Sequence, residues 1–247
     1  MVKNMIDERY LQKLAVKYQT KFPTVAREYL QALFLESFYK LPLSEFFLFK
    51  GGTALRLAFR SPRFSEDLDF SAKTDISIFE DLFIQVAQDL QDLGLKPELE
   101  TAVKTSLGYV GGIKTILYGE NVPIKIHVSQ RKMFTDKGER AMVSGEYLPT
   151  FLVQILGKER LVGEKIEALM TRGKPRDFYD LYFILRAGLL AVKERKILEK
   201  ILPIVAKTQI DFEKELKVFL PKTHWLIISS LKKSLIEEIQ IMLTRKE

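Results

Sequence analysis

Hydrophobic residues follow two different spacings along the first third of the chain. Residues 5–20 and 24–41 carry apolar side chains three and four positions apart, as in TVAREYLQALFLESFYKL, and this spacing predicts two amphipathic helices. The short apolar run FFLFK at 46–50 predicts a buried strand, and it is followed at once by two glycines. The pattern therefore predicts helices first and a strand immediately after them.

Beyond the glycines the pattern changes within a few residues. Thr53 can begin a brief helix that runs to Phe59, and DLDFS at 67–71 alternates polar and apolar residues as a strand does. Helical spacing returns from Ile76 to Leu93 and stops at Gly94. This part of the sequence predicts the order strand, glycine turn, helix, strand, helix.

The rest of the chain divides into a β-rich and a helical part. Residues 95–130 contain short β-like runs, namely KPELETAV, SLGYV, GGIKTILYG and VPIKIHVS, which glycines and a proline separate. From about Leu152 onward the sequence favours helices. We expect an α+β fold, a small mixed sheet with flanking helices followed by a helical C-terminal region, with domains at 1–145 and 146–247.

Composition narrows the chemistry. The 247 residues are 47% hydrophobic, with no cysteine and two histidines, which excludes disulfides, thiolate catalysis and cysteine-rich zinc sites. A metal would therefore bind oxygen ligands, which suits Mg²⁺ or Mn²⁺. No apolar run reaches the length of a membrane span, and the charged N-terminus lacks a secretory signal. We expect a cytoplasmic protein.

Charge indicates the class of partner. The formal net charge is +7 and the pI is about 9.3. A basic surface attracts polyanions such as nucleotides or nucleic acid through long-range electrostatics. General solubility is the alternative explanation, because many basic proteins bind no nucleic acid.

The most informative stretch is FKGGTALRLAFRSPRFSEDLDF. On a strand, Asp67 and Asp69 would point to one face, and two adjacent carboxylates repel unless a cation lies between them. Gly51 and Gly52 before a helix let the main chain come close to a phosphate. The alternatives are an ordinary turn and the solvated face of an edge strand, and a surface arginine at Arg63 that pairs with a neighbouring glutamate.

A second informative stretch is EKIEALMTRGKPRDFYDLYFIL at 164–185. Lys165 would lie on the apolar side of a helix, where it either extends to the surface or reaches a phosphate. Asp177 and Asp180 follow Pro175, and both suit the first turns of a helix electrostatically. Basic residues at 172, 174 and 176 crowd the same turn and offer contacts to phosphate.

The order strand, Gly-Gly, helix, D-x-D resembles the signature of polymerase-β-type nucleotidyltransferases. More narrowly, FKGGTAL followed by RFSEDLDF resembles the AbiEii/AbiGii toxin family, whose nucleotidyltransferase-like members act in abortive infection and toxin–antitoxin systems. The resemblance implies that Asp67 and Asp69 are catalytic metal ligands. It also implies that nucleotide phosphates contact a set of glycine, hydroxyl and basic residues: Gly51, Gly52, Thr53, Arg63 and Ser65.

The second stretch matches the same family. Lys165 followed by R-x-K-x-R-D-F-Y-D-L is similar to its C-terminal motifs, in which a lysine and an aspartate complete the active site from the helical half. The resemblance implies that Lys165 binds nucleotide phosphate and that Asp177 acts in catalysis. Asp180 would support it and Arg176 would contact the nucleotide.

One position departs from the superfamily pattern. A third acid is common on a later strand, but the central position of VPIKIHVSQ is His127. Three interpretations are open: Asp177 replaces the missing acid, His127 itself binds metal or accepts a proton, or the protein binds nucleotide and catalyses poorly. We favour the first interpretation, and a structural role for His127 also stays open.

The leading hypothesis is a metal-dependent nucleotidyltransferase that moves a nucleoside monophosphate from an NTP to an acceptor. The family resemblance implies a toxin with a cognate antitoxin, and a tRNA 3′ end is a candidate acceptor. The alternatives are a catalytically weak nucleotide- or RNA-binding module of the same fold, or an enzyme that transfers AMP to a protein hydroxyl.

Overall fold

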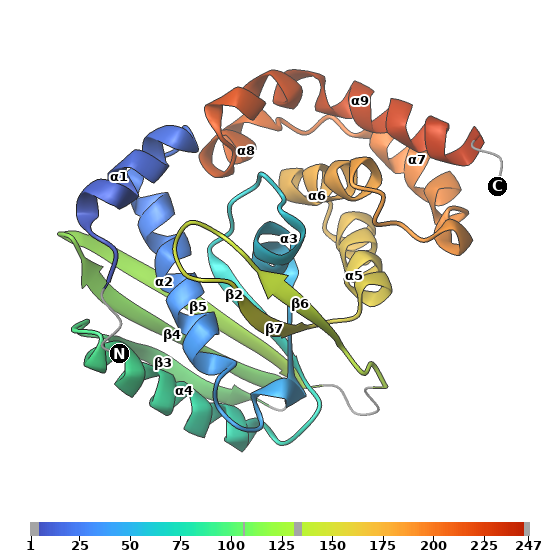
Figure 1. The fold of residues 1–247 in the computed structure, drawn as a ribbon. Coiled ribbons are helices and arrows are strands. Elements are labelled where there is room, and N and C mark those ends of the chain that lie inside the picture. The colour runs from blue at the N-terminus through green and yellow to red at the C-terminus, as the bar shows by residue number, and fades with distance from the viewer. Residues whose placement is uncertain (1–4, 106, 131–134, 245–247) are drawn as a thin grey trace. The chain divides into compact units, whose positions relative to one another are not determined.

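The computed structural model describes residues 5–105, 107–130 and 135–244 (Figure 1). The chain forms two compact units, Met1–Leu156 and Gly157–Glu247. The division falls after Leu156, later than position 145, because a strand at 151–155 belongs to the sheet of the first unit.

A mixed β-sheet is the centre of the first unit. Among the described residues it has seven strands in the order β3-β4-β5-β2-β1-β7-β6. β2 runs antiparallel to β1 and parallel to β5, while β7 runs parallel to β1. The strands are β1 (Phe47–Lys50), β2 (Asp67–Ala72), β3 (Glu98–Thr105), β4 (Gly108–Leu117), β5 (Glu120–Gln130), β6 (Glu139–Val143) and β7 (Phe151–Ile155). The predicted acidic strand, β2, therefore lies inside the sheet and not at its edge.

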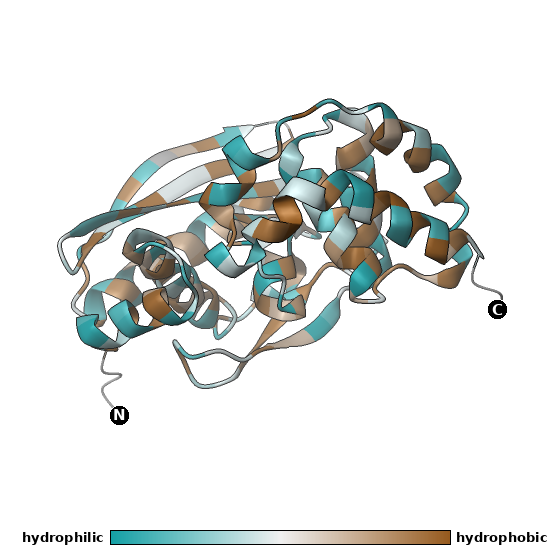
Figure 2. Cartoon of the chain, turned by 90° about the horizontal axis from the view of Figure 1, so that it is seen from above, coloured by the Kyte–Doolittle hydropathy of each residue, from teal (hydrophilic) through white to brown (hydrophobic). Residues whose placement is uncertain are grey.

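Two helices cover one face of this sheet. The helices of the first unit are α1 (Glu8–Lys17), α2 (Phe22–Phe38), α3 (Gly51–Phe59) and α4 (Ile76–Asp92). α2 and α4 pack against the central strands through a cluster of aromatic rings: Phe34, Phe38, Phe47, Phe70, Phe79, Phe83 and Tyr109. Each helix carries both hydrophobic and hydrophilic residues, and the two kinds alternate along the strands (Figure 2). Burial of these rings is the main stabilising contribution at this face.

Two expectations from the sequence were wrong here. FLVQI at 151–155 was expected in a helical region, but it forms β7 between β1 and β6. A five-residue apolar run does not distinguish a buried strand from a helix turn. The runs SLGYV and GGIKTILYG were expected as separate pieces, but one strand, β4, passes through both because Gly111 and Gly112 pair with β5 without interruption.

The second unit is helical. It contains α5 (Lys158–Thr171), α6 (Pro175–Arg186), α7 (Ile197–Lys207), α8 (Glu213–Phe219) and α9 (Trp225–Thr244). α9 packs on α6 and α7 through buried residues spaced three and four apart: Ile228, Leu231, Leu235 and Ile239. No helix in the described part of the chain has the length and apolarity that a membrane span requires.

Candidate functional site

Asp67 and Asp69 point to the same face of the sheet. Along β2 they are half-buried, whereas Leu68 and Phe70 between and after them are fully buried on the opposite face, under α2 and α4. The strand therefore uses its apolar residues for the core and presents its carboxylates on the other face, which we call the acidic face. The predicted alternation is confirmed.

Strand register determines the neighbours of the two aspartates. In the parallel pairing of β2 with β5, Lys125 lies beside Asp67 and His127 lies beside Asp69. In the antiparallel pairing with β1, Lys50 lies opposite Asp69. The acidic face thus places cationic or imidazole side chains on both sides of the carboxylates. It is His127, not an acid, that stands beside Asp69, and its role stays a prediction.

The donor set fits a hard divalent cation. Within the described residues, no group of three or more His, Cys, Asp or Glu side chains is arranged to hold a metal ion. The oxygen ligands that the acidic face offers to a metal ion are the two carboxylates of Asp67 and Asp69. Mg²⁺ is commonly bound in this way, by one or two carboxylates together with substrate phosphates and water.

Gly51 follows β1 directly, begins α3 and lies against Asp69 of the acidic strand β2. Its φ is +78°, a conformation that favours glycine, and a Cβ built on it would lie 2.0 Å from Asp69 Oδ2. The first turn of α3 therefore lies directly against the Asp69 carboxylate. The first N–H groups of a helix have no acceptor inside the helix and attract anions, so a phosphate-binding geometry stands next to the carboxylate pair.

Gly52 makes room for two further predicted residues. A Cβ on Gly52 would lie 2.6 Å from Arg63 Nη2 and 2.7 Å from Ser65 Oγ. Arg63 is only 3% exposed, and Glu66 pairs with Arg27 at 2.6 Å. Arg63 is therefore a buried residue that lies against Gly52, and it is not a surface arginine.

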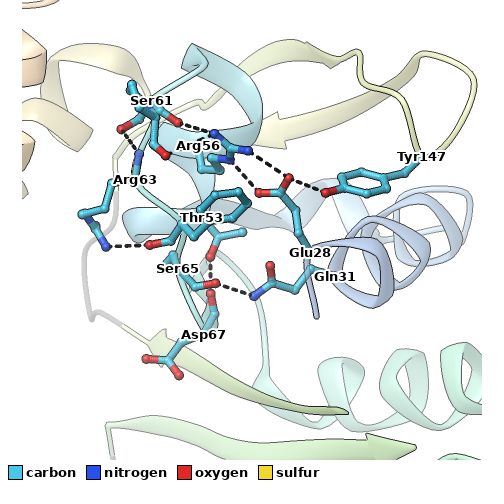
Figure 3. Close-up of polar contacts among 11 residues, drawn as sticks. Glu28, Gln31, Thr53, Arg56, Ser61, Arg63, Ser65, Asp67 and Tyr147 are labelled. Carbon is cyan, nitrogen blue, oxygen red and sulfur yellow. Dashed lines mark hydrogen bonds and ion pairs between the residues drawn. The ribbon is translucent and has the colours of Figure 1, made fainter. Parts of the chain in front are cut away.

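Thr53 has a structural use for its side chain. Its hydroxyl donates to the Asp67 carbonyl at 2.5 Å, and the residue is 1% exposed (Figure 3). The hydroxyl thereby fixes the start of β2, with the Asp67 carboxylate pointing away from Thr53. A contact between this residue and a nucleotide would come from its main-chain N–H.

In the second unit, Lys165 is buried and paired with Asp180. Its Nζ lies 2.9 Å from Asp180 Oδ2, and the two residues are 8% and 1% exposed. Leu161, Val162 and Leu169 on α5 are buried beside it. The lysine does not extend to the surface, and a buried charge pair is weak evidence for a purely stabilising role.

Asp177 closes the N-terminus of α6. One of its oxygens accepts from the Lys174 N–H at 3.0 Å, and Arg172 binds both oxygens, at 2.9 Å and 2.7 Å. The residue is fully buried. A capping carboxylate in this position satisfies the helix end and the arginine fork at once.

The basic turn 172–176 is also engaged. Arg172 is occupied by Asp177, and Arg176 Nε lies 3.5 Å from Glu215 Oε1 of α8. Lys174 is exposed, and its main chain caps α6. The structure brings these predicted residues into one turn, but the acidic partners already present take up much of their charge.

Three polar residues near the glycine turn were not singled out from the sequence. They are Glu28 and Gln31 of α2 and Arg56 of α3, all buried or nearly so. Gln31 and Arg56 contact the loop that carries Arg63 and Ser65, and Glu28 pairs with Arg56. A signal was available, since Glu28 and Gln31 interrupt the apolar side of an otherwise amphipathic helix.

Comparison with known proteins decides the family. The profile described as "Nucleotidyl transferase AbiEii toxin, Type IV TA system" matches residues 33–240. The chain belongs to the AbiEii nucleotidyltransferase toxin family. This match spans both the glycine turn with its acidic strand and the Lys165 and Asp180 helices. The sequence-based resemblance to this family is thereby confirmed.

Solved structures share the fold. JHP933 from Helicobacter pylori superposes with a TM-score of 0.67 at 19% identity, over 90% of this chain and 93% of that one. MenT4, a nucleotidyltransferase toxin from Mycobacterium tuberculosis, gives 0.66 at 15% identity, over 98% and 91%. No curated protein matches the chain. The predicted nucleotidyltransferase-like α+β fold is confirmed by these likenesses.

Proposed function

We propose that this AbiEii-family protein transfers a nucleoside monophosphate from an NTP to an acceptor hydroxyl with the help of a divalent metal ion. The new bond joins the acceptor oxygen to the α-phosphorus, the bond between the α- and β-phosphates breaks, and pyrophosphate and the hydroxyl proton leave. The observation that supports this most is the contact between Asp69 and the first turn of α3. It places a carboxylate pair, the Gly51 main chain, and the Arg63 and Ser65 side chains in one small region of the first unit.

Each of these groups has a stated task in the proposal. Asp67 and Asp69 hold Mg²⁺ or Mn²⁺, which when bound neutralises the charge that develops on the transferred phosphate. The amides at the start of α3 and the Arg63 guanidinium bind and orient the remaining phosphates. The Ser65 hydroxyl donates a further hydrogen bond to these phosphates. Orientation and preorganised charge are the main contributions of a protein to phosphoryl-type transfer.

In the second unit we assign the functional role to Lys165 and Asp180. Asp180 contacts Lys165 directly, whereas Asp177 is engaged with Arg172 and the main chain of α6. Asp180 would then hold and orient the lysine ammonium for a phosphate. This assignment differs from the sequence-based one, which gave catalysis to Asp177 and support to Asp180.

The acceptor and the biological role extend the proposal. Family membership suggests a toxin with an antitoxin partner, and the net charge of +7 suits an RNA acceptor. A tRNA 3′ end is our candidate. A protein hydroxyl that receives AMP is the competing acceptor.

A labelling experiment tests the proposal. Purified protein with Mg²⁺ or Mn²⁺ is offered each α-labelled NTP, with total tRNA and a cell extract as separate acceptors. The double variant Asp67→Asn, Asp69→Asn runs in parallel. We expect label in tRNA from one preferred NTP with the wild type and none with the variant.

The other outcomes are equally informative. Label in a protein band would replace the RNA acceptor with a protein one. Transfer of label by the double variant would show that Asp67 and Asp69 are not needed for catalysis. Intact nucleotide binding without label in any lane would leave a binding module.

A further inference from the structure

The loop between α3 and β2, residues 60–66, carries Arg63 and Ser65 to the glycine turn. It contains no helix or strand, so its shape depends on side chains that hold its carbonyl groups. Two of its residues stand against Gly52, as the close approach of Arg63 Nη2 and Ser65 Oγ shows. Small movements of this loop would therefore move both proposed phosphate contacts.

Arg56 holds the beginning of the loop. Its Nη1 donates to the carbonyls of Ser61 and Pro62, at 3.0 Å and 3.3 Å. The plane of its guanidinium also lies over the Phe64 ring, with Cζ 4.0 Å from the ring centroid. One side chain thus contacts three residues of the loop. Figure 3 shows its hydrogen bond to Ser61.

Glu28 fixes Arg56 in that orientation. Its Oε2 accepts from Arg56 Nε at 2.6 Å, and its Oε1 accepts from Arg56 Nη2 at 3.2 Å and from the Tyr147 hydroxyl at 2.9 Å. Burial would lower the pKa of Arg56, but the Glu28 charge and hydrogen bonds outweigh it and the pKa is raised. The guanidinium therefore stays charged, and its orientation is set by a nearly buried carboxylate.

Gln31 holds the end of the loop. It follows Glu28 by three positions on α2, so the two side chains lie on one face of the helix. Its Nε2 donates to the carbonyls of Ser65 and Glu66, at 3.2 Å and 3.0 Å, and the residue is 1% exposed. α2 therefore reaches the loop at both ends, directly through Gln31 and through Arg56.

We propose that Glu28, Gln31 and Arg56 form a loop clamp that positions Arg63 and Ser65 for the nucleotide phosphates. A buried arginine–glutamate pair costs desolvation and is often no more stable than apolar residues of similar volume. The geometry gives the pair another use, because Arg56 directs its other terminal nitrogen to loop carbonyls. The three are positioning residues, since their contacts are to the loop. This inference rests on the proposed function.

Two clamp variants and one matched control test it. Gln31→Met keeps the side-chain length but removes the amide, and Arg56→Lys keeps the charge but removes the fork. The control is Tyr39→Phe, which removes a hydroxyl within 2.7 Å of the Phe47 carbonyl and 2.9 Å of the Gln154 carbonyl, at the end of β1 away from Gly51. Each change removes a donor group, an amide, a guanidinium or a hydroxyl, that lies within hydrogen-bond distance of two main-chain carbonyls.

The first measurement is the dissociation constant of a non-hydrolysable NTP analogue with Mn²⁺. Each clamp variant should bind it about tenfold more weakly, while the control stays within about twofold of wild type. The second measurement is hydrogen exchange without nucleotide. The amides of Arg63, Phe64 and Ser65 should exchange faster in the clamp variants than in the wild type. In the control their exchange rates should equal those of the wild type.

The two measurements separate the clamp from the proposed function. Faster exchange with unchanged affinity would overturn the positioning role. Clamp variants that match Tyr39→Phe in both measurements would overturn the clamp altogether. If the wild type binds no nucleotide while exchange still separates the variants, the proposed function fails and the clamp is supported as the device that orders the loop.

Discussion

The two acidic pairs of the molecule differ in what surrounds them. Asp67 and Asp69 lie two apart on a strand, half-buried on one sheet face. Asp177 and Asp180 lie three apart on a helix, both almost completely buried and both bonded to a cation, Arg172 or Lys165. The same residue type thus has two uses. The first pair is partly exposed on its sheet face, and the second forms buried ion pairs inside its own unit.

The largest expected effect is a loss of activity without a loss of stability when one aspartate of the Asp67–Asp69 pair is replaced. Asp69→Asn should reduce nucleotide transfer on the order of a thousandfold, because a metal ligand beside the phosphate is lost. The free energy of unfolding should change by less than about 1 kcal/mol, because relief of the repulsion between the two carboxylates offsets the loss of a negative charge at the start of α3. Initial rates of label transfer and urea unfolding measure the two quantities.

Asp81→Asn is the matched control, because Asp81 is an exposed aspartate of α4 in the same unit. It should change neither quantity. An Asp69→Asn protein that transfers label as fast as this control would remove Asp69 from the reaction.

The next effect concerns the buried pair Lys165–Asp180. Lys165→Met should lower the free energy of unfolding by about 3 kcal/mol, because the Asp180 carboxylate stays buried after it loses the charge of Lys165. The double variant Lys165→Met, Asp180→Leu should be within about 1 kcal/mol of wild type, and yet inactive. Fluorescence of Trp225, the only tryptophan, reports unfolding of the second unit, where it begins α9.

A double variant that is as unstable as the single one would show that the pair serves stability. Retained activity in the double variant would exclude both residues from nucleotide transfer.

Asp177→Asn should give a smaller loss of stability, about 2 kcal/mol, followed by the same Trp225 signal. The amide keeps an acceptor for the Lys174 N–H but loses the charge that binds both arms of the Arg172 fork. Nucleotide affinity should be unchanged. Loss of transfer without loss of stability would restore Asp177 to the catalytic role that the family resemblance implied.

This contrast also shows what the sequence could and could not predict. The alternation in DLDF and the glycines after FFLFK are local signals, and both placed Asp67, Asp69 and the α3 start correctly. Spacing alone could not decide between Asp177 and Asp180. The choice depends on which aspartate faces Lys165 of α5, and α6 directs Asp177 to its own N-terminus and Asp180 to the lysine.

Long-range pairing was the other limit. β7 is a strand because Phe49 and Ile155 meet in a parallel ladder, more than a hundred residues apart in sequence. The loop clamp likewise joins Glu28 to Arg56 from different helices. The interruption of the apolar side of α2 marks Glu28 as unusual, but it does not indicate Arg56 as its partner, and FLVQI does not indicate β1, so only the fold reveals these two pairings.

The smallest predicted effect tests the accessible pair by ligand stabilisation. Mn²⁺ at ten times its dissociation constant should raise the free energy of unfolding of the first unit by about 1.4 kcal/mol, because the ion binds only the folded protein. Far-ultraviolet circular dichroism in urea, with and without Mn²⁺, measures the shift, and K⁺ at equal ionic strength serves as a control for general salt effects.

The double variant Asp67→Asn, Asp69→Asn should lose this stabilisation, whereas Asp177→Asn should keep it in full. The reason is the difference between the two pairs: Asp177 is fully buried and already binds both arms of the Arg172 fork, whereas Asp67 and Asp69 are half-buried on a sheet face that a cation can reach. Equal loss in both variants would mean that the metal does not distinguish the pairs, and the assignment of Asp67 and Asp69 as its ligands would fall.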